Sequence, residues 1–109
     1  MNRYAEANFG VNDLDNTRWA EYAAIMDDEI SASEAAEWGQ YDGVASVDAW
    51  AQESVGYACD VAYTNTDGGL VRKGDELAED YYERGAKVVN QRLQQAGVRL
   101  AAILNQVFQ

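Results

Sequence analysis

Apolar side chains recur at helical spacing over the whole last third of this chain. From residue 77 onward most of them are three, four or seven positions apart, which keeps them near one face of a helix. The residues of this pattern are Leu77, Tyr81, Val88, Val89, Leu93, Ala96, Leu100, Leu104 and Val107. The chain also contains no proline, the residue that interrupts helices most strongly. Together these features predict an all-α fold of four to five helices, with the longest helix at the C-terminus.

The start and the interior of this long helix can also be predicted. Asp75 is expected to cap its N-terminus, because a carboxylate can accept the free backbone N–H groups there. Gly85 and Gly97 each cost about 1 kcal/mol in a helix interior. We expect them to mark either breaks in the helix or points where another helix packs closely.

A second apolar stripe runs through residues 17–30 and predicts another helix. Ser31 followed by Glu34 matches a capping box, in which each side chain bonds the other residue's backbone N–H. A short helix is therefore expected after Ser31. It should extend through Trp38, and Gly39 should end it.

Two further helices complete the expected architecture. Ser46 is predicted to cap a helix over residues 46–63, and a short helix is expected over residues 1–8. Residues 64–69 contain only threonine, asparagine, aspartate and glycine, which predicts a loop. A chain of 109 residues is long enough for one modest core, so we expect a single domain over residues 1–109.

Charge divides the chain into an acidic body and a basic final helix. The net charge is −11, and all nineteen acidic residues lie within residues 6–83. The only charged residues after that segment are Arg84, Lys87, Arg92 and Arg99. We expect the basic helix to lie along the acidic part, within one chain or across a dimer. A nucleic-acid contact through these bases is the alternative, which the acidic body disfavours because it repels phosphates.

The chain contains no histidine, and this excludes several kinds of active site. Histidine is the usual zinc ligand and the side chain that titrates near neutral pH. Its absence excludes catalytic triads that use histidine and histidine-ligated zinc. From the residues alone we therefore expect no catalytic residue, no metal site and no cofactor.

A single cysteine, Cys59, excludes a disulfide within the chain. We expect it to be a buried small apolar side chain, since free cysteine is usually buried. The first ten residues lack the apolar segment of a signal peptide, and no apolar run reaches the ~20 residues of a membrane span. The expected location is cytoplasmic by default, without membrane contact.

Four segments occur in an order that is familiar from a known enzyme family. Residues 50–54 read W-A-Q-E-S, residues 58–63 read A-C-D-V-A-Y, residues 81–82 read Y-Y, and residues 96–105 read A-G-V-R-L-A-A-I-L-N. This pattern resembles the C-terminal region of the zinc-dependent, single-strand-specific nucleases of the mung bean nuclease type, which share the zinc phospholipase C fold. The residues that carry the resemblance to the family scaffold are Trp50, Glu53, Ser54, Tyr81, Tyr82, Arg99 and Asn105.

The resemblance implies a helical scaffold without the metal-binding half of the enzyme. The family holds its zinc ions with histidines, aspartates and an N-terminal tryptophan, mostly before the region matched here. The nearest counterpart of the family's last ligand segment is residues 8–13, where Gly10 takes the histidine position and the tryptophan is absent. Asp13 or Asp15 stands near the family's aspartate, but the spacing does not fit. We carry over no metal ligand. Residues 13–18 also resemble the start of a calcium loop, but Arg18 occupies the position where such a loop requires glycine.

These observations favour a non-catalytic helical module that binds another protein or a second copy of itself. Two alternatives stay open: a subunit of a split zinc nuclease that is active only with a second chain, and an acidic mimic of nucleic acid that binds a basic protein. The expected interface is an apolar stripe on the long helix, with Arg92 and Arg99 meeting acids of the partner such as Glu79 or Asp80. The interface candidates are Val89, Leu93, Ala96, Gly97, Leu100, Ala101 and Leu104.

Overall fold

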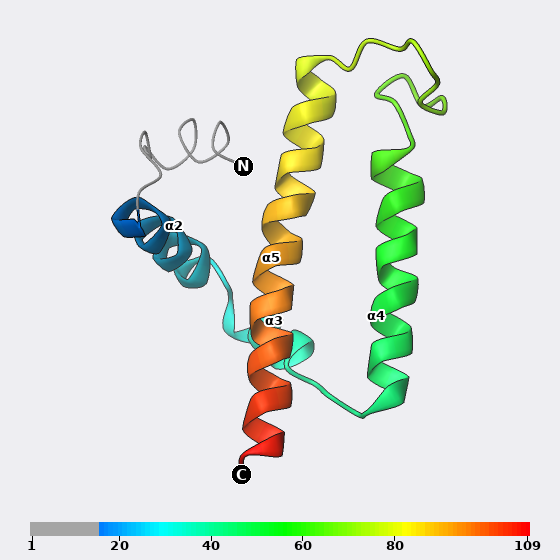
Figure 1. The fold of residues 1–109 in the computed structure, drawn as a ribbon. Coiled ribbons are helices and arrows are strands. Elements are labelled where there is room, and N and C mark those ends of the chain that lie inside the picture. Colours follow the sequence, from blue (N-terminus) through cyan, green and yellow to red (C-terminus); the bar gives the residue numbers. More distant parts are fainter. Residues whose placement is uncertain (1–15) are drawn as a thin grey trace.

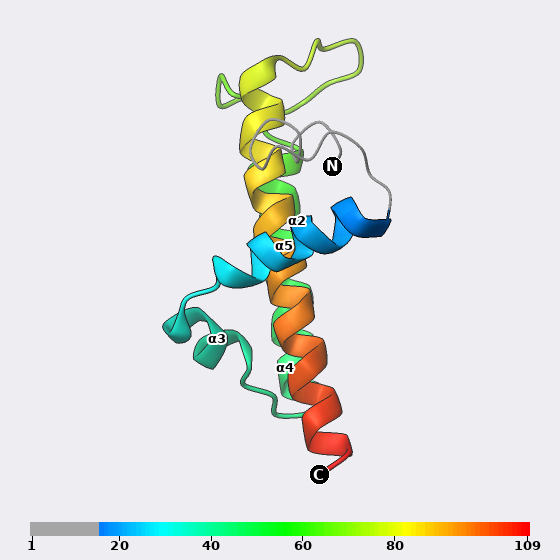
Figure 2. The same cartoon turned by 90° about the vertical axis from the view of Figure 1, so that its left-hand side faces the viewer.

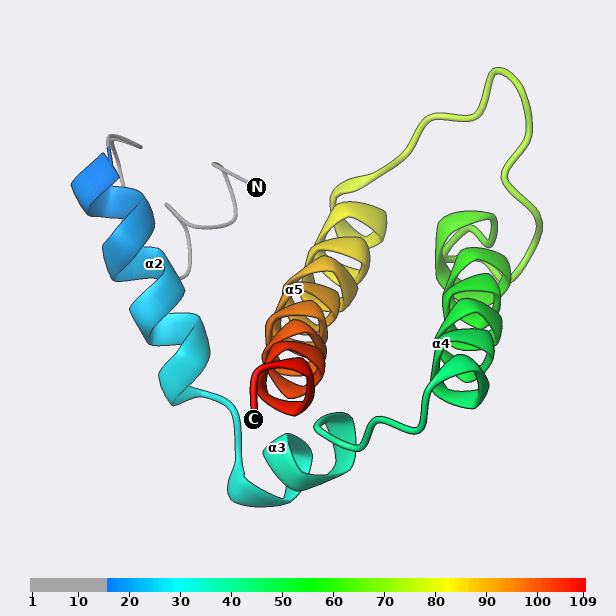
Figure 3. The same cartoon turned by 60° about the horizontal axis from the view of Figure 1, so that its bottom comes forward.

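The computed structural model describes residues 16–109 as helices arranged around one long central helix. Helix α2 spans Asn16–Asp28, α3 spans Ala32–Trp38, and α4 spans Val44–Tyr57. One π-helical turn, η1, continues α4 over Ala58–Ala62, and α5 spans Glu79–Val107. Helix α5 lies in the middle, with α4 antiparallel to it on one side and α2 and α3 on the others (Figures 1 and 3).

The predicted fold class is confirmed for the described residues. They contain no strand, only one isolated bridge between Thr64 and Leu70, and the C-terminal helix is the longest. The helix expected over residues 1–8 lies outside the described residues, as do residues 8–13 and Asp15. None of the described helices is long and apolar enough to cross a membrane.

The capping box at the start of α3 is confirmed. The Ser31 hydroxyl oxygen accepts a hydrogen bond from the Glu34 backbone N–H at 3.1 Å, and the Ser31 N–H donates to Glu34 Oε1 at 3.0 Å. At the other end, the Gly39 N–H donates to the carbonyl of Ala35 at 3.0 Å. The short helix therefore begins and ends where the sequence predicts, because both ends are satisfied by local bonds.

The predicted cap at Asp75 is wrong. Helix α5 begins at Glu79 after Ala78, which makes no side-chain cap bond. Asp75 instead accepts the Arg72 N–H through Oδ2 at 2.8 Å and closes a turn that contains Gly74 at a φ of 93°. The carboxylate serves its own loop, so the segment before α5 is a turn rather than a first helical turn.

The predicted cap at Ser46 is also wrong. Helix α4 begins two residues earlier, at Val44, after Gly43 at a φ of 60°, a left-handed value that favours glycine. Ser46 accepts the Asp42 N–H through its hydroxyl at 2.7 Å, which fastens the preceding loop to the first turn of the helix.

The two glycines of the long helix do not break it. Helix α5 runs without interruption through Gly85 and Gly97, and a Cβ added at either position would meet no atom within 4 Å. No helix of the described residues packs closely against them, so the expectation that they mark a break or a close helix contact is wrong for this part of the chain. The space beside Gly97 is therefore open in this structure.

A small core forms where α2 and α3 meet α5. Tyr22, Met26 and Trp38 are the buried apolar side chains among the described residues. The Tyr22 hydroxyl donates to Asn90 Oδ1 at 2.9 Å, and Gln94 Nε2 donates to the Met26 carbonyl at 2.8 Å. Polar side chains of α5 thus tie α2 to it alongside the apolar contacts, because buried polar atoms need partners.

The first turns of α5 bind the end of the bundle at which η1 lies. The Arg84 guanidinium donates to the carbonyls of Val61, at 3.0 Å, and Thr64. The Tyr81 hydroxyl donates to the Ala62 carbonyl at 2.7 Å. These bonds satisfy two carbonyls at the end of η1 and one shortly after it, where the helical ladder stops.

Cys59 lies in η1 and is exposed, so its predicted burial is wrong. Trp50, Ser54 and Tyr57 face α5 from α4, and Cys59 follows at a spacing that places it on the opposite side. Its position on the far side of the helix explains the exposure.

Candidate functional site: the Glu53 cluster

Glu53 on α4 receives two arginines from α5. Arg99 Nη1 lies 2.9 Å from Glu53 Oε1, and Arg99 Nη2 donates to Oε2 at 3.1 Å. Arg92 Nη1 also pairs with Oε1. A guanidinium that meets a carboxylate through two parallel bonds is the geometry that arginine favours. The three side chains therefore clamp two antiparallel helices together.

Aromatic rings of α4 lie beneath both guanidinium groups. The Arg99 guanidinium carbon is 5.1 Å from the centre of the Trp50 ring, and that of Arg92 is 5.1 Å from the Tyr57 ring. Arg92 also donates to the Ser54 hydroxyl. Each arginine is held from one side by a carboxylate and from another by a ring, so its orientation is fixed.

Two glutamines of α5 extend this cluster. The Tyr57 hydroxyl donates to Gln91 Oε1 at 3.2 Å, and Arg92 Nη1 donates to Gln95 Oε1 at 2.9 Å. Gln95 is among the most buried side chains of the structure. Sequence reasoning missed both residues. The signal was present, since Gln91, Gln95 and Arg99 recur every fourth residue and form a polar stripe beside the apolar one.

Hydrogen bonding controls the protonation of Glu53. The hydrogen bond from Arg99 holds the pKa of this carboxyl below its ordinary value of 4.5; desolvation opposes the shift, and the hydrogen bond and charge of Arg92 assist it. Glu53 is therefore ionised at neutral pH and has no proton to give as a general acid. Both of its oxygens already pair with guanidinium groups.

The lowered pKa predicts a specific pH dependence. A carboxyl whose folded pKa is depressed stabilises the fold above its unfolded pKa, and this stabilisation is lost as pH falls through the folded value. We expect the wild-type chain to lose more unfolding free energy between about pH 7 and about pH 3 than a Glu53→Gln variant, whose amide does not titrate. Urea titrations of both proteins at the two pH values measure the difference. Equal losses would contradict this role of Glu53.

A polar pocket of about 490 Å³ lies beside the cluster, between α3, α4 and α5. Glu34 and Glu37 of α3 border it together with Trp50, Gln95 and Arg99. Among the described residues, no three histidine, cysteine or acidic side chains gather closely enough to hold a metal ion. The donors of residues 16–109 thus do not form a zinc site of the kind that the family has in its metal-binding half.

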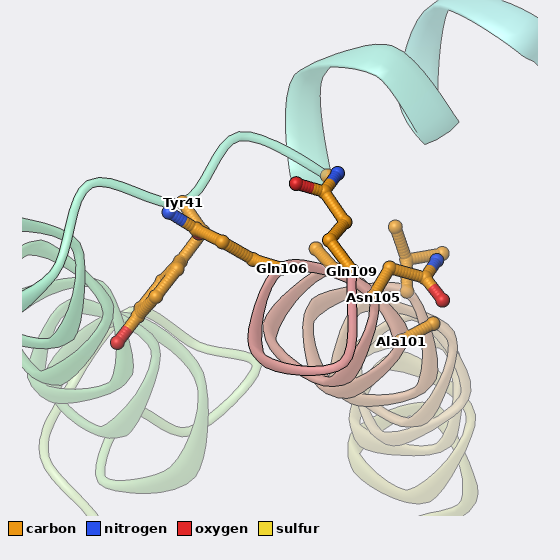
Figure 4. A pocket seen from close by; sticks show the side chains of 8 residues that line it. Tyr41, Ala101, Asn105, Gln106 and Gln109 are labelled. Carbon is orange, nitrogen blue, oxygen red and sulfur yellow. The ribbon is translucent and has the colours of Figure 1, made fainter.

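A second pocket, of about 610 Å³, lies at the end of α5 and contains Asn105, one of the residues that carry the family resemblance. Tyr41 borders it from the segment after α3, while Asn105 and Gln106 come from the last turn of α5 and Gln109 follows that helix (Figure 4). Asn105 lies apart from the Glu53 cluster. Tyr81 lies at the opposite end of α5, next to Tyr82 in the sequence, and binds the Ala62 carbonyl.

The interface candidates occupy two places on α5. Ala101 borders the pocket of Figure 4. The others share the exposed face of α5; these are Val89, Leu93, Ala96, Gly97, Leu100 and Leu104.

The basic helix contacts the acidic part within one chain, which is one of the two arrangements that the charge distribution predicts. Arg92 and Arg99 both pair with Glu53 of the same molecule. Trp50, Glu53, Ser54 and Arg99, four residues that carry the family resemblance, thereby meet in one cluster.

Comparison with known proteins identifies the family to which the sequence is similar. The sequence profile of the family described as S1/P1 Nuclease matches residues 3–109. Endonuclease 2 of Arabidopsis thaliana is 44% identical over 64 residues, which are 59% of this chain and 20% of that protein. Endonuclease 4 of the same plant is 38% identical over 69 residues, 63% of this chain and 21% of that protein. The chain thus spans about a fifth of the length of these relatives. No solved structure matches the chain significantly.

Proposed function

Because this chain belongs to the S1/P1 nuclease family, we propose that it is a non-catalytic helical module of the nuclease scaffold that works by binding another protein. The observation that carries the proposal is that residues of the family motifs bind one another. Trp50, Glu53 and Arg99 bind one another and hold α4 against α5, which leaves none of them free for chemistry. Their role here is structural.

The donor chemistry of the whole sequence supports the same proposal. Zinc sites in proteins use histidine nitrogen and cysteine sulfur for high affinity. The chain has no histidine and one cysteine, so only carboxylates remain to complete a site. Carboxylates without nitrogen or sulfur donors suit magnesium or calcium better than zinc.

We expect the purified chain to retain no stoichiometric zinc after dialysis and to cleave neither single-stranded DNA nor RNA. Metal analysis and a nuclease assay with added zinc measure both properties, and an active member of the family serves as positive control. Metal-dependent cleavage by the chain alone would show that the module is an enzyme, provided that the activity persists through further purification.

A second candidate function is that of a subunit in a split zinc-dependent nuclease. It is favoured by the exposed apolar face of α5, where Leu93, Leu100 and Leu104 are each about half exposed. An apolar face of this size on a soluble chain marks a surface that another protein covers. In this case cleavage would appear only when a second chain supplies the metal-binding residues.

A further inference from the structure

The polar pocket between α3, α4 and α5 is large enough to hold a small molecule. Helix α3 lies on one side of the α4–α5 pair (Figures 2 and 3). The pocket that the three helices share has a volume of about 490 Å³, which is within the usual range of small-molecule sites. Its walls differ in chemistry, and that difference indicates which ligand it accepts.

The α5 wall of the pocket carries N–H donors that lack acceptors. Gln95 accepts from Arg92 through Oε1, but its Nε2 group donates to no atom of residues 16–109. Within the same described part of the chain, Arg99 Nε has no acceptor either. Both side chains border the pocket, and the two residues are only 3% and 9% exposed. Because a buried donor without an acceptor is costly, this wall favours a ligand that brings acceptor atoms.

The α3 wall is acidic. Glu34 and Glu37 border the pocket three residues apart, on one face of α3. Glu34 uses Oε1 for the capping box, and the Glu37 carboxylate makes no hydrogen bond or ion pair with any described residue. The third acid of the lining, Glu53, is already matched by Arg92 and Arg99. The α3 wall therefore favours a cationic group.

The two walls require opposite properties of the same ligand. It needs acceptor oxygens for the α5 wall and a positive charge for the α3 wall. The rings of Trp50 and Tyr57 also border the pocket, and the methylene stem of a long cationic side chain packs well on such surfaces. A basic amino acid combines a carboxylate, a stem of this kind and a cationic end in one small molecule.

We propose that this pocket binds a free basic amino acid such as arginine. The ligand carboxylate accepts a hydrogen bond from Gln95 Nε2, and the ligand side chain meets Glu34 and Glu37 of α3. The site is separate from the exposed apolar face of α5 and does not depend on the protein-binding role proposed for the module.

The test is a titration of the full, isotope-labelled chain with L-arginine, followed by nuclear magnetic resonance. We expect saturable binding of one arginine per chain that shifts the side-chain N–H signals of Gln95. Two relatives of arginine separate the walls: agmatine lacks the carboxylate, and citrulline lacks the side-chain charge. Each should bind about 10-fold more weakly than arginine, because each loses a charged hydrogen-bond or ion-pair partner.

A double variant, Glu34→Gln with Glu37→Gln, removes both charges of the α3 wall. Glutamine also completes a capping box, and Glu37 is exposed, so circular dichroism should show unchanged helix content. The variant should bind arginine about 10-fold more weakly. Glu21→Gln is the matched control, because Glu21 is an exposed acid of α2 that does not border the pocket. It should bind arginine as the wild type does.

Three results would overturn the proposal. The first is a titration with L-arginine that does not saturate. The second is agmatine binding as tight as that of arginine, which would mean that the α5 wall does not hold a carboxylate. The third is a helical double variant that binds arginine as tightly as the Glu21→Gln control, which would mean that the α3 wall does not hold the cationic group.

Discussion

Replacement of Trp38 by alanine is expected to lower the free energy of unfolding by about 3–5 kcal/mol, the usual cost of removing a large aromatic side chain from a core. Trp38 ends α3 and is only 6% exposed. The described core contains two other buried apolar side chains, Tyr22 and Met26, so little else can close the cavity. Since small domains are stable by about 5–15 kcal/mol in total, this loss is a large share of the whole.

Trp19→Ala is the matched control, because it removes the same side chain at a position that is 40% exposed. Trp19 packs on the edge of Tyr22 with ring centres 6.0 Å apart, so its loss should cost about 1 kcal/mol. Urea denaturation followed by circular dichroism measures both variants. A Trp38→Ala loss no larger than that of Trp19→Ala would show that α3 does not anchor the core.

Replacement of Glu53 by alanine is expected to cost about 1.5–3 kcal/mol, the usual range for hydrogen bonds to charged groups. It leaves Arg92 and Arg99 without their carboxylate, and the Arg99 side chain is only 11% exposed. The Glu53 side chain is 34% exposed, so solvent screening keeps the loss well below that of a fully buried ion pair.

Glu21→Ala provides the control for this substitution. Glu21 pairs with Arg18 one turn away on the surface of α2, and both side chains are about half exposed. Such pairs contribute about 0–1 kcal/mol, so this variant should resemble the wild type. Urea denaturation at neutral pH compares the two. Equal effects of Glu53→Ala and Glu21→Ala would mean that the cluster does not hold α4 on α5.

The sequence predicted those parts of the fold that depend on neighbours along the chain. The capping box at Ser31 and the presence of the longest helix at the C-terminus follow from local spacing, and both are confirmed. Asp75 and Ser46 show the limit of such reasoning. Each side chain can accept a backbone N–H, but only the geometry of the adjacent turn decides which one, and in both cases the partner lies in a loop.

The cluster itself was only half predictable. The sequence marked Trp50, Glu53, Ser54 and Arg99 as residues that resemble a family scaffold, and the charge distribution predicted that the basic helix meets acids. It did not show that Glu53 is the acid, because Glu53 and Arg99 are 46 residues apart. That pairing depends on how α4 and α5 align, which the turns between them set and which local patterns do not encode.

The structural role of Glu53 and Arg99 is tested most directly by a double-mutant cycle on unfolding free energy, with Glu53→Ala, Arg99→Ala and the double variant. If the two side chains hold α4 against α5, their coupling energy should be about 1–2 kcal/mol, and the double variant should lose clearly less than the sum of the single losses. A coupling energy below about 0.3 kcal/mol, within the error of additive sites, would contradict a structural clamp between these two residues.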